Sequence, residues 1–228
     1  MLVSTLITTF GLASSAQAWG TLGHKTVANV ALQFLPPNVV SSLDAILAAD
    51  GHKTFPDPSI VDVAPWADDF DHQHDGSGDF SKEFHFIDAQ DDPPFDCNID
   101  LNRDCSGPNG CVVKAIANYT QQLVSPNGDA DDLADALKFV VHFLGDVTQP
   151  LHAEAYKRGG NDISVKWDGH KKKLHGVWDT TMITELAGPD NQDSLDSWTN
   201  QIVTEINSGS YKDLVSEWIS CTDINDAI

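Results

Sequence analysis

The stretch Phe139–His152, which reads FVVHFLGDVTQPLH, carries three side chains of the kinds that bind metal ions. His142 and Asp146 are four residues apart in an apolar run, so on a helix both point from one face. Pro150 ends that helix, and His152 follows the break. Two ligands on one helical turn and a third just beyond it predict a zinc site. The alternative is a structural histidine–aspartate pair, and the other histidines bear on that choice.

Nine histidines occur in the chain, and they fall into two groups. A buried histidine must satisfy two ring nitrogens, so packing alone explains poorly why several lie beside apolar residues. The segment Leu174–Asp179 repeats the four-residue spacing of histidine and aspartate, and two such turns facing each other would supply more than one zinc site. The candidates for ligands are His24, His85, His142, His152 and His175, and those expected in solvated loops are His52, His72, His74 and His170.

The chain begins with an apolar segment that ends Ala16-Gln17-Ala18, the small-x-small pattern of a secretory signal peptide. Residues 1–18 are therefore interpreted as a signal peptide and not as a membrane span. Cleavage after Ala18 would make Trp19 the new amino terminus. We expect a secreted, extracellular protein.

Four cysteines in a secreted chain favour disulfide bonds. Cys105 and Cys111 flank the turn-rich sequence SGPNG and are expected to pair, which would leave Cys97 and Cys221 as the remaining pair. Asn118 begins an Asn-Tyr-Thr sequon, so it is a candidate glycosylation site in a secreted chain.

Composition limits the classes of fold and partner. With 228 residues, of which 41% are hydrophobic, the chain suits one globular domain. The formal net charge of −21 argues against binding to duplex nucleic acid through a basic face. Recognition of a partner must then depend on a local site and not on the overall charge of the chain.

Apolar periodicity predicts a mainly α fold with one small β-hairpin. The hairpin begins with Ile163–Trp167 and turns at Asp168-Gly169. Residues 71–110 have loop composition, interrupted by the apolar run Phe84–Ile87. The predicted helices are Leu22–Leu35, Val39–Ala49, Ile60–Phe70 with a break at Pro65, Val112–Val124, Asp131–Thr148, Leu174–Leu186, Ser194–Ile206 and Tyr211–Ile219.

An ordered set of short motifs gives the chain a family resemblance. The motifs are Trp19-Gly20 with His24, Trp66-Ala67-Asp68, His85-Phe86-Ile87-Asp88, HFLGD, TQPLH and LHGVWD. The set resembles the secreted, zinc-dependent single-strand-specific nucleases of fungi and plants, of the S1/P1 type, which are relatives of the bacterial zinc phospholipases C. The resemblance runs from Trp19 to about Ser220 and implies one helical nuclease domain over residues 19–228, expected to be a monomer.

The resemblance implies a cluster of three zinc ions. Nitrogen and oxygen ligands suit zinc, and Asp146 can bridge two ions because a carboxylate has two oxygens. Alternatively, Trp19 is a hydrophobic plug and His24 a core histidine. Under the resemblance, removal of residues 1–18 completes the site, because only the free amine of Trp19 can bind metal. The implied ligands are Asp68, His85, His142 and Asp146 for one ion, His152, His175 and Asp179 for a second, and the amine and carbonyl of Trp19, His24 and Asp146 for a third.

The implied reaction is hydrolysis of single-stranded DNA and RNA to 5′-phosphate products, together with 3′-nucleotidase activity. Close zinc ions lower the pKa of a bound water, which can then lose a proton and attack phosphorus. Asp68 is the carboxylate expected to orient that water. Asn161 matches a position near the phosphate, where its amide could donate to the developing charge; alternatively it is a turn residue after two glycines.

Single-strand preference has a candidate source in Phe86 and Asp88. An aromatic ring can stack on a splayed base, and a carboxylate can accept hydrogen bonds from base amino groups, contacts that a paired base does not offer. Phe86 is alternatively a core residue, since it lies in an apolar run. The run Lys171–Lys173 either approaches phosphates or is a solvated loop.

Two features depart from the family pattern. Asp71 stands where the family usually has a basic residue that helps neutralise the transition state. Family members also continue past the end of this chain, with further helices and a cysteine that pairs with the Cys97 position, so Cys221 comes too early for that role. We therefore expect the C-terminal part of the family fold to be missing and stability to be reduced. The alternatives to a nuclease are a phospholipase C on the same scaffold and a truncated zinc-binding secreted protein with little catalysis.

Overall fold

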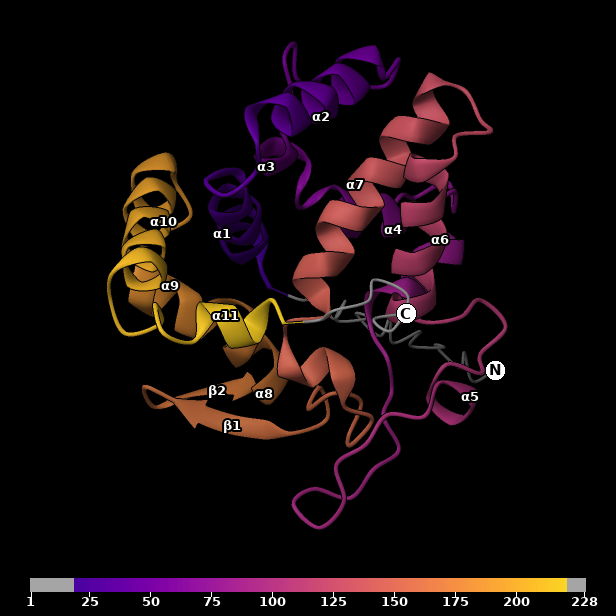
Figure 1. Ribbon diagram of the computed structural model, residues 1–228. Helices are drawn as coiled ribbons and strands as arrows, with labels where there is room; N and C mark the ends of the chain where they lie inside the picture. Colours follow the sequence, from indigo (N-terminus) through magenta and orange to yellow (C-terminus); the bar gives the residue numbers. More distant parts are fainter. Residues whose placement is uncertain (1–18, 221–228) are drawn as a thin grey trace, which may run out of the picture.

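The computed structural model describes residues 19–220, so the predicted signal peptide over residues 1–18 and Cys221 lie outside the described residues. Within that range the fold is mainly helical with one two-stranded antiparallel sheet, as predicted (Figure 1). The helices are α1 (Thr21–Leu32), α2 (Pro37–Ala49), α3 (Ile60–Val63), α4 (Trp66–Asp71), α5 (Leu101–Asp104), α6 (Val112–Val124), α7 (Ala130–Asp146), α8 (Leu174–Gly176), α9 (Met182–Ala187), α10 (Gln192–Asn207) and α11 (Val215–Trp218).

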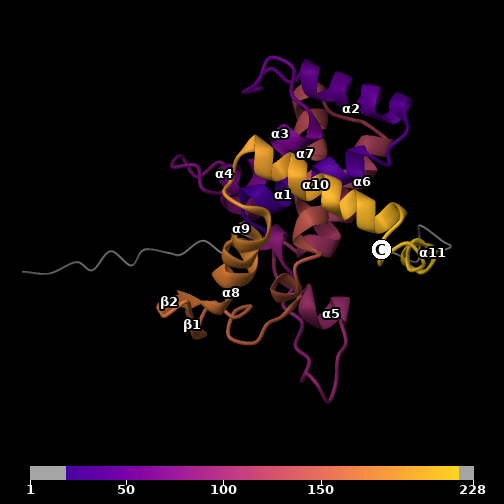
Figure 2. The same cartoon turned by 90° about the vertical axis from the view of Figure 1, so that its left-hand side faces the viewer.

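Helix α7 lies at the centre of the structure. The Asp129 carboxylate accepts hydrogen bonds from the backbone N–H groups of Asp131 and Asp132, and the Asp132 side chain accepts one from the N–H of Asp129. This capping box satisfies N–H groups that a helix leaves unpaired at its start. Helices α6 and α2 pack against α7, and α1 lies between α7 and α10 (Figures 1 and 2).

Two apolar clusters lie on different faces of α7. In one, the rings of Phe139 and Phe143 stack on each other, and Tyr119 of α6 stacks on Phe139 at 4.5 Å. In the other, Leu137 packs with Leu47 of α2 and with residues of α1 and α3. Burial on both sides fixes the rotation of α7 about its axis, and therefore the direction in which His142 and Asp146 point.

The predicted break at Pro65 separates α3 from α4. Ser59 starts α3 through a capping box with Asp62, and the chain turns at Ala64 before α4 begins at Trp66. The break leaves the carbonyl of Ala64 free of the helical hydrogen-bond ladder, and this carbonyl lies 2.7 Å from Nδ1 of His142.

The hairpin is confirmed, with β1 (Ser164–Trp167) antiparallel to β2 (His170–Lys173). Its two turn residues, Asp168 and Gly169, have φ angles of 48° and 78°. Two successive left-handed residues suit a tight hairpin turn, which explains the Asp-Gly pair.

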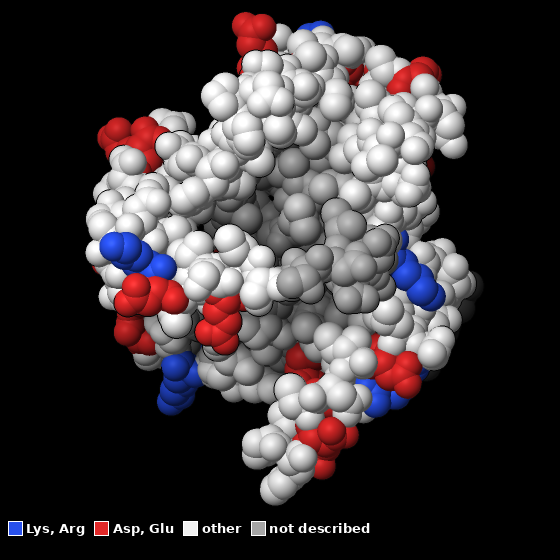
Figure 3. Space-filling model, viewed as in Figure 1, with Lys and Arg blue, Asp and Glu red and all other residues white. Residues whose placement is uncertain are grey.

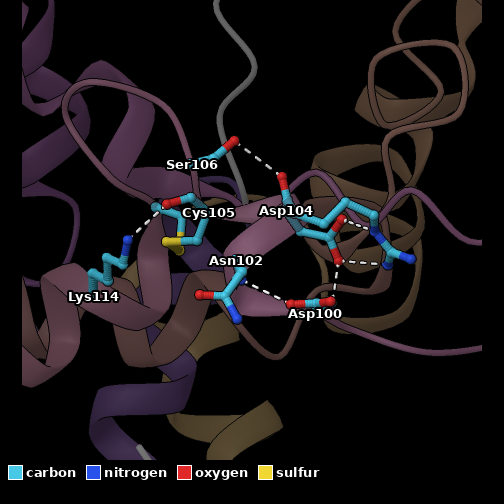
Figure 4. The surroundings of a disulfide bond; sticks show 8 residues. Asp100, Asn102, Asp104, Cys105, Ser106 and Lys114 are labelled. Atoms are coloured by element: carbon cyan, nitrogen blue, oxygen red, sulfur yellow. Dashed lines mark hydrogen bonds and ion pairs between the residues drawn. A yellow bond between two sulfur atoms is a disulfide. The ribbon is translucent and has the colours of Figure 1, made fainter.

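Residues 71–110 form the expected long connection, which also contains the 3₁₀ segment Asp79–His85 and the short helix α5. The predicted disulfide between Cys105 and Cys111 is confirmed, with the two Cα atoms 5.2 Å apart. Beside it, Asp104 accepts hydrogen bonds from Arg103 and from the N–H of Asp100, and Lys114 donates to the carbonyl of Cys105 (Figure 4). Cys97 is exposed.

Two predicted helices differ in the structure. The predicted helix Leu174–Leu186 is divided into α8, a π-helical turn at Val177–Thr181, and α9. The predicted helix Tyr211–Ile219 is wrong at its start, because α11 covers only Val215–Trp218. The chain after α10 folds back on that helix instead, and the N–H of Tyr211 donates to the carbonyl of Glu205.

None of the helices in residues 19–220 combines the length and the apolar character that a membrane span requires. On the face shown in Figure 3, acidic and basic side chains are scattered around the rim, and neither sign forms a continuous patch.

Candidate metal centre

The eight predicted ligands other than Trp19 have buried side chains and come from seven elements. Helix α7 contributes His142 and Asp146, which are fully buried. Six other elements contribute one ligand each: His24 in α1, Asp68 in α4, His85 at the end of the 3₁₀ segment Asp79–His85, His152 in the 3₁₀ turn Pro150–Ala153, His175 in α8 and Asp179 in the π-helical turn. The four histidines predicted in solvated loops, His52, His72, His74 and His170, are exposed as expected, although His170 lies in β2 and not in a loop.

Four donor atoms converge around His142. Its Nε2 lies 3.2 Å from Nδ1 of His85 and 3.3 Å from Oδ2 of Asp146. The same Nε2 lies 3.4 Å from Oδ1 of Asp68. Nδ1 of His85 lies 3.0 Å from Oδ2 of Asp146 and 3.6 Å from Oδ1 of Asp68. Ligands of a tetrahedral zinc ion are about 3.3 Å apart, since zinc bonds to nitrogen and oxygen measure about 2.0–2.1 Å. The four atoms therefore have the spacing of one zinc coordination shell.

A second group lies where the 3₁₀ turn Pro150–Ala153 meets α8. Nε2 of His152 lies 3.1 Å from Nε2 of His175, which lies 3.2 Å from Oδ2 of Asp179. The π-helical turn at Val177–Thr181 carries Asp179. The group offers three donors, the number found in zinc sites that keep one position open.

His24 faces the other oxygen of Asp146. Its Nε2 lies 3.2 Å from Oδ1 of Asp146, and neither atom makes a hydrogen bond. Buried polar atoms that lack a partner are rare, and a metal ion between these two atoms would satisfy both. The His24 ring stacks on His142 at 3.9 Å. Gly145 leaves room for the His24 ring beside α7, because a Cβ atom at this position would lie 2.7 Å from Nδ1 of His24.

Trp19 lies beside this group and is half-buried. Its indole N–H donates to the hydroxyl of Thr148 at 2.9 Å. The next N–H, of Gly20, donates to the carbonyl of Asp179 at 2.7 Å. The start of the described chain is thus held between the end of α7 and the segment that carries Asp179.

Three of the clustered histidines use their second ring nitrogen in the same way. Nδ1 of His142 contacts the carbonyl of Ala64 at 2.7 Å, and Nδ1 of His152 contacts that of His85 at 2.6 Å. Nδ1 of His175 contacts the carbonyl of Gly159 at 2.5 Å. A carbonyl only accepts, so each Nδ1 carries a proton and each Nε2 points toward the cluster. Gly159 has a φ of 57°, and a Cβ there would lie 2.4 Å from the carbonyl of Leu151, so glycine is required.

The electrostatic environment separates the two parts of the cluster. Burial opposes charge on both His142 and Asp146, but the attraction between the two side chains outweighs burial. The pKa of His142 is therefore raised above its usual value, and the pKa of Asp146 is lowered. In the second group burial lowers the pKa of His152 to about 4. Burial, with the nearby charge of Asp146, raises the pKa of Asp179 to about 9 despite a hydrogen bond from Gln149. Several buried carboxylates lie close together with too few hydrogen-bond donors, and a bound cation would compensate their negative charge.

Gln149 is a residue of this site that the sequence did not identify. It is fully buried; its amide N–H donates to Oδ1 of Asp179 at 2.5 Å, and its carbonyl oxygen accepts from the N–H of Leu151 at 2.6 Å. Gln149 therefore orients one ligand of the second group. The TQPLH motif contains it, but only the fold brings it to Asp179.

The three predicted substrate residues lie close to the cluster in the chain. Phe86 is half-buried and Asp88 exposed, and both follow His85, whose carbonyl contacts His152. Asn161 is half-buried two residues after Gly159, and its amide N–H donates to the carbonyl of Arg158 at 3.0 Å. That bond matches the alternative role of Asn161 as a turn residue. Asn161 nevertheless lies near the site, because it closely follows Gly159, whose carbonyl contacts Nδ1 of His175.

Comparisons with known proteins agree with this geometry. Residues 19–227 match the model of the family described as S1/P1 Nuclease. The chain is 41% identical to nuclease P1 of Penicillium citrinum over 210 residues, which cover 92% of this chain and 75% of that protein. It is 41% identical to nuclease S1 of Aspergillus oryzae over 96% of this chain and 74% of that protein. Endonuclease 2 of Arabidopsis thaliana is 32% identical over 92% of this chain and 71% of that protein.

Proposed function

The chain belongs to the S1/P1 nuclease family and is a nuclease, and from that premise we propose that its buried cluster binds three zinc ions and hydrolyses single-stranded DNA and RNA to 5′-phosphate products. A 3′-nucleotidase activity belongs to the same proposal. The observation that carries it is that the ring nitrogens of His85 and His142 lie 3.2 Å apart and each lies 3.0–3.6 Å from a carboxylate oxygen of both Asp68 and Asp146.

The proposed ligand sets follow the three groups of donors. The first ion would be held by Asp68, His85, His142 and Asp146, and the second by His152, His175 and Asp179. The third would be held by His24, Asp146, and the amine and carbonyl of Trp19. Nε2 of His24 and Oδ1 of Asp146 are buried, face each other and lack hydrogen-bond partners, which supports this third set. Only nitrogen and oxygen donors are present, as zinc accepts.

Bound zinc would lower the pKa of water and stabilise negative charge on phosphate oxygens. Asp68 is buried, and its neighbours His142 and His85 outweigh burial and hold its pKa below the usual value, so it is an anion that can accept a hydrogen bond from the attacking water. His152 and His175, whose pKa values are lowered by burial, are held by carbonyls in the tautomer that presents a lone pair at Nε2, so they need no proton loss before binding.

Substrate recognition is proposed for Phe86, Asp88 and Asn161. The half-buried ring of Phe86 can stack on an unpaired base, and the exposed carboxylate of Asp88 can accept from a base amino group. The side-chain amide of Asn161 has two protons on Nδ2 and donates one of them to the carbonyl of Arg158, so the other N–H is available for a phosphate oxygen. Duplex DNA offers no unpaired base to these groups, so we propose single-strand preference and no stable duplex binding.

The hairpin adds a local positive charge to an acidic chain. Lys166, Lys171, Lys172 and Lys173 lie on β1 and β2, and within residues 19–220 none forms an ion pair with a carboxylate. Lys172 donates to the hydroxyl of Thr181 at 3.0 Å, beside a hollow of about 570 Å³. The strand leads directly into α8, which carries His175. We propose that these lysines contact phosphates of a substrate that extends beyond the cleaved bond.

One assay tests the proposal. Zinc-loaded protein lacking residues 1–18 is incubated with single-stranded DNA, a 3′-nucleotide and phosphatidylcholine vesicles, with and without a chelator. The expected result is chelator-sensitive release of 5′-nucleotides from DNA and of phosphate from the 3′-nucleotide, with no lipid hydrolysis. Bound zinc without either release would contradict the proposed function. Hydrolysis of the lipid alone would favour a phospholipase C.

Secretion and a monomeric state are also proposed. Asn118 is exposed on α6 and so accessible for glycosylation. The mass of the secreted product would establish whether Trp19 is its first residue and whether Asn118 carries a glycan. Light scattering would measure the oligomeric state.

A further inference from the structure

His85 differs from the other clustered histidines in the partner of its second ring nitrogen. Its Nδ1 points into the cluster, and its Nε2 is buried without a hydrogen-bond partner. The nearest carboxylate on that side is Asp71, whose Oδ2 lies 3.7 Å from Nε2 of His85. His142, His152 and His175 instead contact backbone carbonyls at 2.5–2.7 Å.

Asp71 is itself buried and short of donors. It is 7% exposed at the end of α4, and its Oδ1 makes no hydrogen bond although it lies against Nδ1 of His72. Nδ1 of His72 contacts the carbonyl of Asp68 at 2.6 Å, and a ring N–H donated there is not available to Asp71. The N–H at Nε2 of His85 would supply a donor.

We propose that Asp71 is a positioning residue that accepts the Nε2–H of His85 and thereby holds Nδ1 of His85 toward the metal. A carboxylate behind a ligating histidine fixes the tautomer and makes the ligand more basic. The inference rests on the proposed zinc function.

The test measures zinc affinity and needs no substrate. Asp71→Asn keeps the size of the side chain and removes its charge, and Asp71→Leu removes the acceptor as well. Asp69→Asn is the matched control, because Asp69 is an exposed neighbour on the same helix. Each zinc-loaded variant is titrated with a competing chelator, and cobalt-substituted samples are compared by their visible spectra.

We expect one zinc ion of Asp71→Leu to bind about 10- to 100-fold more weakly, with a smaller loss in Asp71→Asn and none in the control. We also expect a changed cobalt spectrum in Asp71→Leu. Wild-type affinity and an unchanged spectrum in a folded Asp71→Leu would overturn the inference while leaving the zinc function intact. If Asp71→Leu does not fold, wild-type affinity in Asp71→Asn overturns it equally. Wild-type protein that binds no zinc would instead refute the proposed function.

Discussion

Nε2 of His24 lies 3.2 Å from Oδ1 of Asp146, and neither atom makes a hydrogen bond. The other oxygen of Asp146 lies 3.0 Å from Nδ1 of His85 and 3.3 Å from Nε2 of His142. One carboxylate at the end of α7 therefore faces two groups of donors, one with each oxygen. This arrangement makes the two proposed ions dependent on the same side chain.

Substitution Asp146→Ala is expected to remove more than one zinc ion. If both oxygens bind metal, the variant should retain about one ion per chain in place of three, namely the one held by His152, His175 and Asp179. Elemental analysis after gel filtration measures the content. His175→Ala is the comparison, because it should release a single ion. Equal losses in the two variants would show that Asp146 does not bridge.

Substitution Gln149→Leu tests the buried amide that orients Asp179. The variant removes the donor to Oδ1 of Asp179, and we expect about 10- to 100-fold weaker binding of the ion held by His152, His175 and Asp179. Competition with a chelator followed by zinc analysis measures this change. Gln121→Leu on the exposed face of α6 is the control. Unaltered zinc affinity in Gln149→Leu would mean that Asp179 needs no such support.

The sequence predicted the parts of this site that depend on local spacing. The four-residue interval of His142 and Asp146 requires only a helix, and Asp168-Gly169 requires only a hairpin turn, so both were accessible from neighbouring residues. The division of histidines into buried and exposed groups followed from their apolar neighbours. Gln149 was missed because its contact with Asp179 spans 30 residues. The π-helical turn that presents Asp179 has no comparable pattern in the sequence.

The same limit applies to Asp71. The sequence identified it as a departure from the family pattern, but its proximity to Nε2 of His85 is created by α4 packing against the 3₁₀ segment Asp79–His85. A helix that looked continuous from apolar spacing, Tyr211–Ile219, failed for a related reason. The chain there forms hydrogen bonds to the end of α10, which local propensity does not describe.

The hairpin lysines are expected to affect long substrates selectively. The triple substitution of Lys166, Lys171 and Lys173 by glutamine removes exposed charges and leaves the Lys172–Thr181 hydrogen bond in place. We expect the Michaelis constant for single-stranded DNA to rise, and the slope of its dependence on salt to fall by about 0.7 for each phosphate that is no longer neutralised. Hydrolysis of a 3′-nucleotide should change little. An equal loss on both substrates would indicate damage to the metal centre instead, and Lys212→Gln serves as the distant control.

The ion pair beside the disulfide gives the stability of the metal-free protein a pH dependence. Asp104 accepts hydrogen bonds from Arg103 and from the N–H of Asp100 (Figure 4), and also from the N–H of Gln90. The bond from Arg103 contributes most to holding the pKa of Asp104 below its usual value. A carboxyl group with a lowered pKa in the folded state stabilises that state above its unfolded pKa of about 3.9, and this stabilisation is lost as the pH falls below that value.

Substitution Asp104→Asn should therefore lower the free energy of unfolding at pH 7 by about 1 kcal/mol, a modest amount because Arg103 is partly exposed. The difference from wild type should shrink as the pH falls below about 4, because the unfolded wild-type chain then binds a proton at Asp104 while the folded carboxylate stays ionised. Urea unfolding of both proteins in chelator at the two pH values measures it. Asp44→Asn on the exposed face of α2 controls for the change in net charge. A deficit in Asp104→Asn that persists unchanged in acid would assign the loss to packing, since the ionised carboxylate would then contribute nothing to it.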